Sequence, residues 1–170
     1  QVLELAAQAG VPGQLPPVDQ ETPAEEAEPE QKPLSPEHQK AFDALSANDL
    51  DGAEAAYREA LAKAPADQDA KAGLANVGLM KRLANQDAGE IRQAAAAAPT
   101  DIKAQMLVAD LDLAGGHLDD AFVRLLGLFP GADPEGKNTL RERMLEYFDI
   151  VGPTHPSVIT ARRQLTSLLY

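Results

Sequence analysis

Prolines and alanines recur at a fixed spacing along this chain of 170 residues. Pro65 and Pro99 lie 34 residues apart, and Ala53 and Ala121 lie 68 residues apart, which is twice that spacing. The string DLDGA, which ends at Ala53, also corresponds to HLDDA, which ends at Ala121. A period of this length indicates copies of one structural unit, because a short unit cannot bury its apolar face alone and must share it with the next copy.

The residue types within the period are those of a helical hairpin. Small residues let two helices approach closely, an aromatic residue fills the space between helices, and a proline ends the second helix. The first unit has this pattern at Ala41, Ala53, Tyr57, Ala60 and Pro65. In period and in residue types it resembles the tetratricopeptide repeat, which is a helix–turn–helix unit.

Further units follow in the same phase. The second has Asp87 where a small apolar residue is expected and is therefore degenerate, and the third has Gly115 and Gly116 as the turn between its helices. A last helical pair is expected at the C-terminus, with Asp133 and Thr154 capping its two helices. The sequence therefore predicts an all-α fold of tetratricopeptide-like helical hairpins, with about four helix pairs.

The composition favours helices and limits the classes of partner. Aromatic residues make up 4% of the chain and tryptophan is absent, whereas sheets favour aromatic and β-branched residues. The formal net charge of −12 disfavours binding to nucleic acid and to anionic membrane surfaces. No uninterrupted apolar run approaches the roughly 18 residues of a membrane-spanning helix.

The chain divides into three predicted segments. Residues 1–10 carry an apolar helical pattern, and we expect them to be the tail of a helix from a preceding domain. Residues 11–35 are rich in proline and acidic residues, and this composition predicts a flexible linker. Residues 36–170 are expected to form the helical repeat domain.

The sequence predicts no catalytic, cofactor-binding or metal site. It has no cysteine, and its three histidines lie far apart without the spacing of zinc ligands: His38, His117 and His155. Asp110, Asp112 and Gly115 resemble the start of a calcium loop, but the fifth and twelfth positions would be Ala114 and Ala121, which supply no ligand. We therefore predict a protein that is not an enzyme.

The five consecutive alanines of residues 94–98 have two interpretations. Alanine has a high helix propensity and permits close helix packing, so the run can be a buried crossing point. Alternatively, the run forms a smooth apolar strip that is open to a partner.

The C-terminal sequence carries a more specific resemblance. Residues 145–152 read LEYFDIVG and residues 161–170 read ARRQLTSLLY, with Pro156 between them. These strings resemble the C-terminus of bacterial thioredoxin-like co-chaperones of the YbbN/CnoX (chaperedoxin) type, and residues 1–14 resemble the end of their last thioredoxin helix. In that family a thioredoxin domain is followed by a linker and a short helical-repeat domain. Any redox activity would belong to a thioredoxin domain outside these 170 residues.

The resemblance implies cytoplasmic protein quality control. Such proteins hold unfolded or oxidised clients and pass them to folding chaperones, including a GroEL-type chaperonin, to which the C-terminal helix docks. On this basis the candidate protein-binding residues are Arg162, Arg163, Leu165, Leu168, Leu169 and Tyr170. The alternative is that the leucines close the helical stack while the arginines face solvent, because apolar stripes at helical spacing are usually core.

Two functions follow from these observations. The leading hypothesis is a co-chaperone module that binds unfolded clients. The alternative is an adaptor or scaffold repeat domain that binds one specific folded partner. Broad binding of unfolded peptides would favour the first, and a single tight partner would favour the second.

Overall fold

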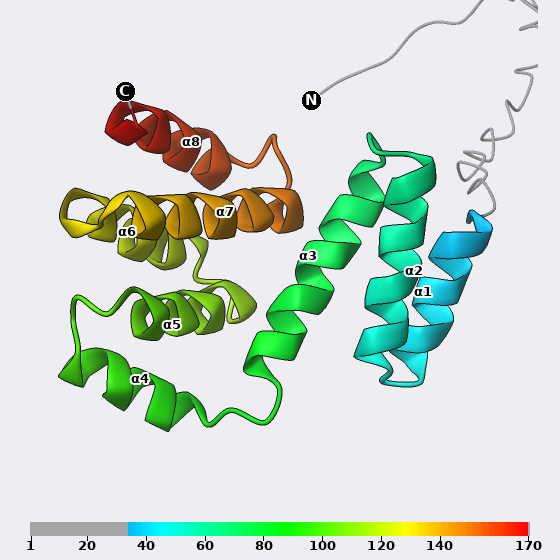
Figure 1. Ribbon diagram of the computed structural model, residues 1–170, viewed down its shortest axis with the longest axis horizontal. Helices are drawn as coiled ribbons and strands as arrows, with labels where there is room; N and C mark the ends of the chain where they lie inside the picture. The colour runs from blue at the N-terminus through cyan, green and yellow to red at the C-terminus, as the bar shows by residue number, and fades with distance from the viewer. Residues whose placement is uncertain (1–33, 170) are drawn as a thin grey trace, which may run out of the picture. The chain divides into compact units, whose positions relative to one another are not determined.

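The computed structural model describes residues 34–169, so the predictions for residues 1–10 and 11–33 and for Tyr170 lie outside the described range. Within that range there are eight α-helices, one short 3-10 helix and no strand. The helices are α1 (Pro36–Ser46), α2 (Leu50–Lys63), α3 (Gln68–Leu83), α4 (Ala88–Ala97), α5 (Ile102–Ala114), α6 (Leu118–Leu128), η1 (Phe129–Gly131), α7 (Pro134–Val151) and α8 (Pro156–Leu169) (Figure 1). The prediction of an all-α fold with about four helix pairs is confirmed.

Aspartate side chains cap five of these helices. Each accepts a hydrogen bond from the backbone N–H three residues further on, at 2.7 to 2.9 Å: Asp49, Asp67, Asp87, Asp101 and Asp133. These bonds satisfy N–H groups that have no partner within the helix. The expected cap at Asp133 is confirmed. The expected cap at Thr154 is wrong by one residue, because α8 begins at Pro156 and the Nδ1 atom of His155 accepts from the Ser157 N–H at 3.2 Å.

The first and third repeat units form closed helical hairpins. Helix α1 packs along α2, and α5 packs along α6. The first turn contains Asn48 at φ 56° and the third contains Gly116 at φ 81°, a left-handed conformation that asparagine and glycine adopt most readily. These two turn residues lie 68 positions apart, so the backbone of these two units follows the predicted period.

The second unit departs from the predicted pairing. Its left-handed turn residue is Asn85, which follows Asn48 by 37 residues rather than 34, so α3 is extended and α4 begins only after its cap at Asp87. Helix α3 packs against α2, α5 and α7, whereas α4 packs against α5, and α3 and α4 do not lie along one another (Figure 1). The second unit, which the sequence marked as degenerate, therefore does not close a hairpin, because the late turn delays its second helix.

The main core lies among α3, α5, α6, α7 and α8. Its largest fully enclosed apolar side chains are Leu125, Leu140, Met144, Tyr147, Phe129 and Val158. The ring of Phe122 lies 5.5 Å from that of Phe148 and 6.3 Å from that of Tyr147, between centroids. Three of the chain's few aromatic residues thus meet where α6 packs on α7, and they fix the position of the C-terminal pair.

The first hairpin meets α3 through a glycine. The ring of Tyr57 on α2 lies so close to Gly73 on α3 that a Cβ atom at Gly73 would stand 2.3 Å from the Tyr57 Cζ atom. The hairpin itself is closed by alanines, of which Ala41 and Ala53 are completely buried. The expected roles of small residues in close helix approach and of Tyr57 as the filler between helices are both confirmed.

Candidate protein-binding site

A buried polar network joins α3, α5 and α7, and the two helices of the candidate site, α6 and α8, pack against these helices. Its centre is Asp110 of α5, which is completely buried. The Oδ1 atom of Asp110 accepts from the Arg82 Nη2 at 3.1 Å and from the Tyr147 hydroxyl at 2.7 Å. Its Oδ2 atom accepts from the Arg82 Nε at 2.9 Å and from the Arg143 Nη1 at 2.6 Å. Because Arg82 lies on α3 while Arg143 and Tyr147 lie on α7, this carboxylate joins three helices.

The charges of this network balance. Glu146 lies 3.0 Å from the Arg82 Nη1 and 3.5 Å from the Arg143 Nε, so two guanidinium groups face two carboxylates. Burial lowers the pKa of Arg82, but the hydrogen bond and charge of Asp110 outweigh that effect and leave the pKa raised. Burial, together with the Asp110 charge, raises the pKa of Tyr147 far above its ordinary value. The Tyr147 hydroxyl therefore remains a hydrogen-bond donor at every physiological pH.

The sequence pattern around Asp110 indicated only an incomplete calcium loop and not this role. A signal was present, because the residue before Asp110 is Ala109, the residue after it is Leu111, and the surrounding helix is mostly apolar. A charged residue in such a segment must find buried partners. Which residues would supply those partners depends on how α3 and α7 pack.

An apolar surface lies between α6 and α8. Val123 of α6 is 67% exposed and Leu168 of α8 is 38% exposed, while the neighbouring Phe122 and Leu126 are buried. Two shallow clefts of about 370 and 360 Å³ adjoin here, and both are lined by Val123 and Gln164. We call the clefts and these lining residues the α6–α8 surface. Exposed large apolar side chains beside preformed clefts are typical of a protein-binding site.

The structure places the candidate residues of α8 in different environments. Leu165 is buried in the core, and Arg162 lies with its guanidinium 5.2 Å from the Phe148 ring centroid. Arg163, Leu168 and Leu169 are exposed. Tyr170 lies outside the described residues. Of the described candidates, only Leu168 lines the α6–α8 surface.

The profile of the tetratricopeptide repeat family matches residues 81–170, which is more than half of the chain. The chain belongs to this family. The match covers the last part of α3 and all of α4 to α8. The α1–α2 hairpin precedes the matched range, and its turn geometry repeats that of the α5–α6 hairpin within the range.

The chain is also similar to three proteins described as uncharacterized, one from Mycobacterium bovis and two from strains of Mycobacterium tuberculosis. Each is 27% identical over 137 residues, which is 81% of this chain and 45% of the relative. The chain therefore spans a little under half the length of these relatives.

Tetratricopeptide domains are generally non-catalytic modules that bind other proteins, and stacked repeats present extended surfaces for this purpose. The chain is accordingly a protein–protein interaction module. Among the described residues no group of three metal-ligating side chains is assembled. None of the described helices combines the length and the apolar character needed to cross a membrane.

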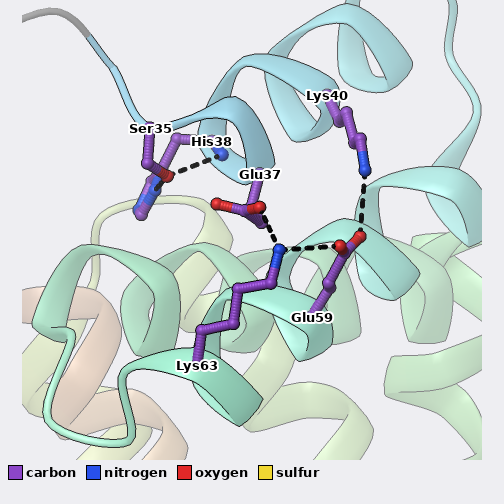
Figure 2. Close-up of polar contacts among 6 residues, drawn as sticks. All are labelled: Ser35, Glu37, His38, Lys40, Glu59 and Lys63. Carbon is purple, nitrogen blue, oxygen red and sulfur yellow. Dashed lines mark hydrogen bonds and ion pairs between the residues drawn. The ribbon is translucent and has the colours of Figure 1, made fainter.

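A cluster of polar side chains also joins the two helices of the first hairpin (Figure 2). Lys63 of α2 donates to Glu37 of α1 at 2.5 Å and to Glu59 at 3.0 Å, and Lys40 of α1 donates to the same Glu59 at 3.1 Å. The hydrogen bonds from Lys63 lower the pKa of the Glu37 and Glu59 carboxyl groups. These ion pairs connect α1 to α2 across the hairpin.

Proposed function

We propose that this tetratricopeptide domain is the client-binding module of a thioredoxin-like co-chaperone, that it holds unfolded proteins on the α6–α8 surface, and that it docks through α8 on a GroEL-type chaperonin. The observation that carries the proposal is the exposure of Val123, which lines both open clefts, and of Leu168, which lines one of them. Unfolded clients expose apolar side chains, and such side chains gain free energy when they leave water for an apolar cleft.

The shape of the surface suits clients of varied sequence. The clefts are shallow and adjoining, so they can accept side chains of different sizes without a single fixed pocket. Their edges carry uncharged polar groups from α8, among them Thr160, Gln164 and Ser167. The net charge of −12 opposes aggregation of complexes with clients that expose apolar surface, because the complexes repel one another.

The proposed docking on a chaperonin assigns separate roles to the residues of α8. Leu165 anchors the helix in the core, and Arg162 positions it against Phe148. Leu168 borders the α6–α8 surface, so Arg163 and Leu169 remain for the chaperonin, together with Tyr170. A cytoplasmic location belongs to this same proposal.

Suppression of client aggregation tests the client-binding part. A chemically denatured enzyme is diluted into buffer with the full chain, and light scattering is followed. We expect the wild-type chain to suppress scattering and Val123→Asp to lose much of this effect, because a charge on the surface opposes apolar binding. Ala55→Asp, at an exposed position on α2, is the matched control. Equal suppression by both variants, or none by the wild type, would reject the proposal.

A pull-down with purified GroEL-type chaperonin tests the docking part separately. We expect retention of the wild-type chain and loss of retention for Leu169→Asp, because Leu169 is exposed near the end of α8. Val123→Asp should still be retained. If the chain suppresses aggregation but does not bind the chaperonin, the docking part of the proposal is rejected and the client-binding part is retained.

The alternative is an adaptor that binds one folded partner. The observation in its favour is that the residues next to Val123 and Gln164 along the chain, Phe122 and Leu165, are buried in the core. The surface therefore has a fixed shape. A fixed shape favours a single complementary partner. Competition separates the two functions: unrelated unfolded peptides displace one another from a holdase, whereas they leave an adaptor's partner bound.

A further inference from the structure

A cavity lies over α3, between α2 and α7 (Figure 1). Its volume is about 280 Å³, and none of its lining residues belongs to the α6–α8 surface. Part of its wall is apolar and consists of Leu61 on α2 with Leu74, Ala75 and Gly78 on α3. A volume of this order suits a small molecule, and an apolar side chain gains free energy when it leaves water for such a wall.

Two opposite charges border the same cavity and have no partner among the residues that the structure describes. Lys71 of α3 and Asp149 of α7 are both half-buried. Neither side chain forms an ion pair or a hydrogen bond with another residue in the range 34–169, although both line one small cavity. A half-buried charge gains more from an opposite charge than a fully exposed one does, because less water screens it.

The other charged groups of the cavity are already balanced. Glu54 of α2 pairs with Arg58 and, at 2.6 Å, with Lys81. Glu146 of α7 pairs with the Arg82 guanidinium at 3.0 Å. A ligand in the cavity therefore meets one ammonium group from α3, one carboxylate from α7 and an apolar wall. This combination is complementary to a small molecule that carries both charges and an apolar group.

We propose that this cavity binds a free amino acid with an apolar side chain. The carboxylate of the ligand pairs with Lys71, its ammonium group pairs with Asp149, and its side chain packs on Leu74. Hydrogen bonds between ionised groups are stronger than neutral ones, and a ligand with both charges satisfies both residues at once. An anion alone would be repelled by Asp149, and a cation alone would be repelled by Lys71.

The proposal goes beyond client binding and chaperonin docking, because those functions are assigned to residues of α6 and α8. It also gives the bound amino acid a structural effect, since the ligand connects α3 to α7. Either proposal can hold without the other.

A titration of the isotope-labelled full chain, followed by NMR, tests the proposal at about pH 6.5, where an α-amino group is protonated. The probe is L-leucine. Its comparisons are leucine amide, which lacks the carboxylate, N-acetyl-leucine, which lacks the ammonium group, and N-acetyl-leucine amide, which lacks both. We expect leucine to bind at least about tenfold more tightly than each comparison, because each loses at least one charged pair. The backbone N–H signal of Gly78 should shift on binding, and added salt should weaken the binding.

Two variants assign each charge to its residue. Lys71→Gln should reduce the affinity for leucine about tenfold, to that of leucine amide or below, and should not reduce the affinity for leucine amide. Asp149→Asn should likewise reduce the affinity for leucine to that of N-acetyl-leucine or below. Because neither residue pairs with another described side chain, both variants should unfold at the urea concentration of the wild type. Lys103→Gln, which removes a charge at an exposed position on α5, is the matched control and should bind leucine as the wild type does.

Three results would overturn the proposal. The first is an absence of leucine binding at millimolar concentration. The second is equal affinity for leucine and for N-acetyl-leucine amide, because the cavity would then accept any apolar group, including one from a polypeptide segment. The third is an equal effect of Lys71→Gln and Lys103→Gln on leucine binding, because net charge rather than the cavity would then decide the affinity.

Discussion

Arg82 of α3 donates two parallel hydrogen bonds, at 2.9 and 3.1 Å, to the two carboxylate oxygens of Asp110 on α5. This bidentate pair fixes both the distance and the angle between the two side chains. It lies at the place where the repeat is irregular, because α3 and α4 do not close a hairpin. The polar network therefore connects α3 to the following repeats where the usual packing between paired helices is missing.

Replacing Asp110 by asparagine should destabilise the fold strongly. Asp110→Asn leaves Arg82 and Arg143 without the charge that balances them and turns an amide NH2 toward their donors. Breaking a buried ion pair costs about 3–5 kcal/mol, and we expect about 3 kcal/mol because both arginines retain some contact with solvent. The free energy of unfolding is measured by urea denaturation followed by circular dichroism.

The control for this prediction is Asp120→Asn. Asp120 lies exposed in the first turn of α6, so removal of its charge should change the free energy of unfolding by less than about 0.5 kcal/mol. If both asparagine variants unfold at the same urea concentration, the Asp110 network contributes no stability.

Removing the hydroxyl of Tyr147 should have a smaller effect. Tyr147→Phe keeps the ring in the core but deletes the 2.7 Å hydrogen bond to Asp110, which should cost about 1.5–3 kcal/mol for a bond to a charged group. Tyr57→Phe is the matched control, since the Tyr57 hydroxyl has no hydrogen bond to another residue of the described range. In the Asp110→Asn background, Tyr147→Phe should cost less than it does alone, because the shared partner is already changed. Additive losses would contradict the network.

The period and the residue types were enough to predict the helical hairpins, because both are local consequences of turn and packing chemistry. Asn48 and Gly116 show this directly, since their left-handed turns repeat at twice the period. The splayed second unit was not predicted. The sequence showed Asp87 where the repeat expects a small apolar residue. Its role as the cap of α4 follows from the late turn at Asn85, which the spacing of alanines and prolines does not predict.

The candidate site was harder to predict from the sequence than the helical hairpins were. The apolar stripe of α8 was visible, but Leu165 faces the core while Leu168 faces the α6–α8 surface, and this division depends on where α6 packs. Val123 carries no local signal, because an exposed valine and a buried one look alike in a helical pattern. A surface formed by helices from different units can be predicted only when the packing of those units is known.

The ion pairs of the first hairpin should make its stability dependent on pH. Hydrogen bonding to Lys63 lowers the pKa of Glu37 and of Glu59 below the ordinary value of 4.5. A lowered carboxyl pKa stabilises the folded state above the unfolded-state pKa, and this contribution is lost as pH falls through the folded-state value. Lys63→Gln should therefore lower the urea midpoint at neutral pH, and its difference from the wild type should shrink below about pH 4.5. A difference that is constant across this range would show that Lys63 acts through packing alone.

Two glycine-to-alanine substitutions should change stability in opposite directions. At Gly73 on α3 the new Cβ atom would lie 2.3 Å from the Tyr57 Cζ atom, so Gly73→Ala should cost about 1–3 kcal/mol through overpacking. At Gly127 on α6 a Cβ atom meets nothing within 4 Å, so Gly127→Ala should stabilise by about 0.5–1 kcal/mol through helix propensity. Both changes gain the same propensity, so the difference between their urea midpoints isolates the contact with Tyr57. Adding Tyr57→Leu to Gly73→Ala should recover part of the loss, and a double variant no more stable than the sum of the single effects would show that the ring is not what excludes the Cβ atom.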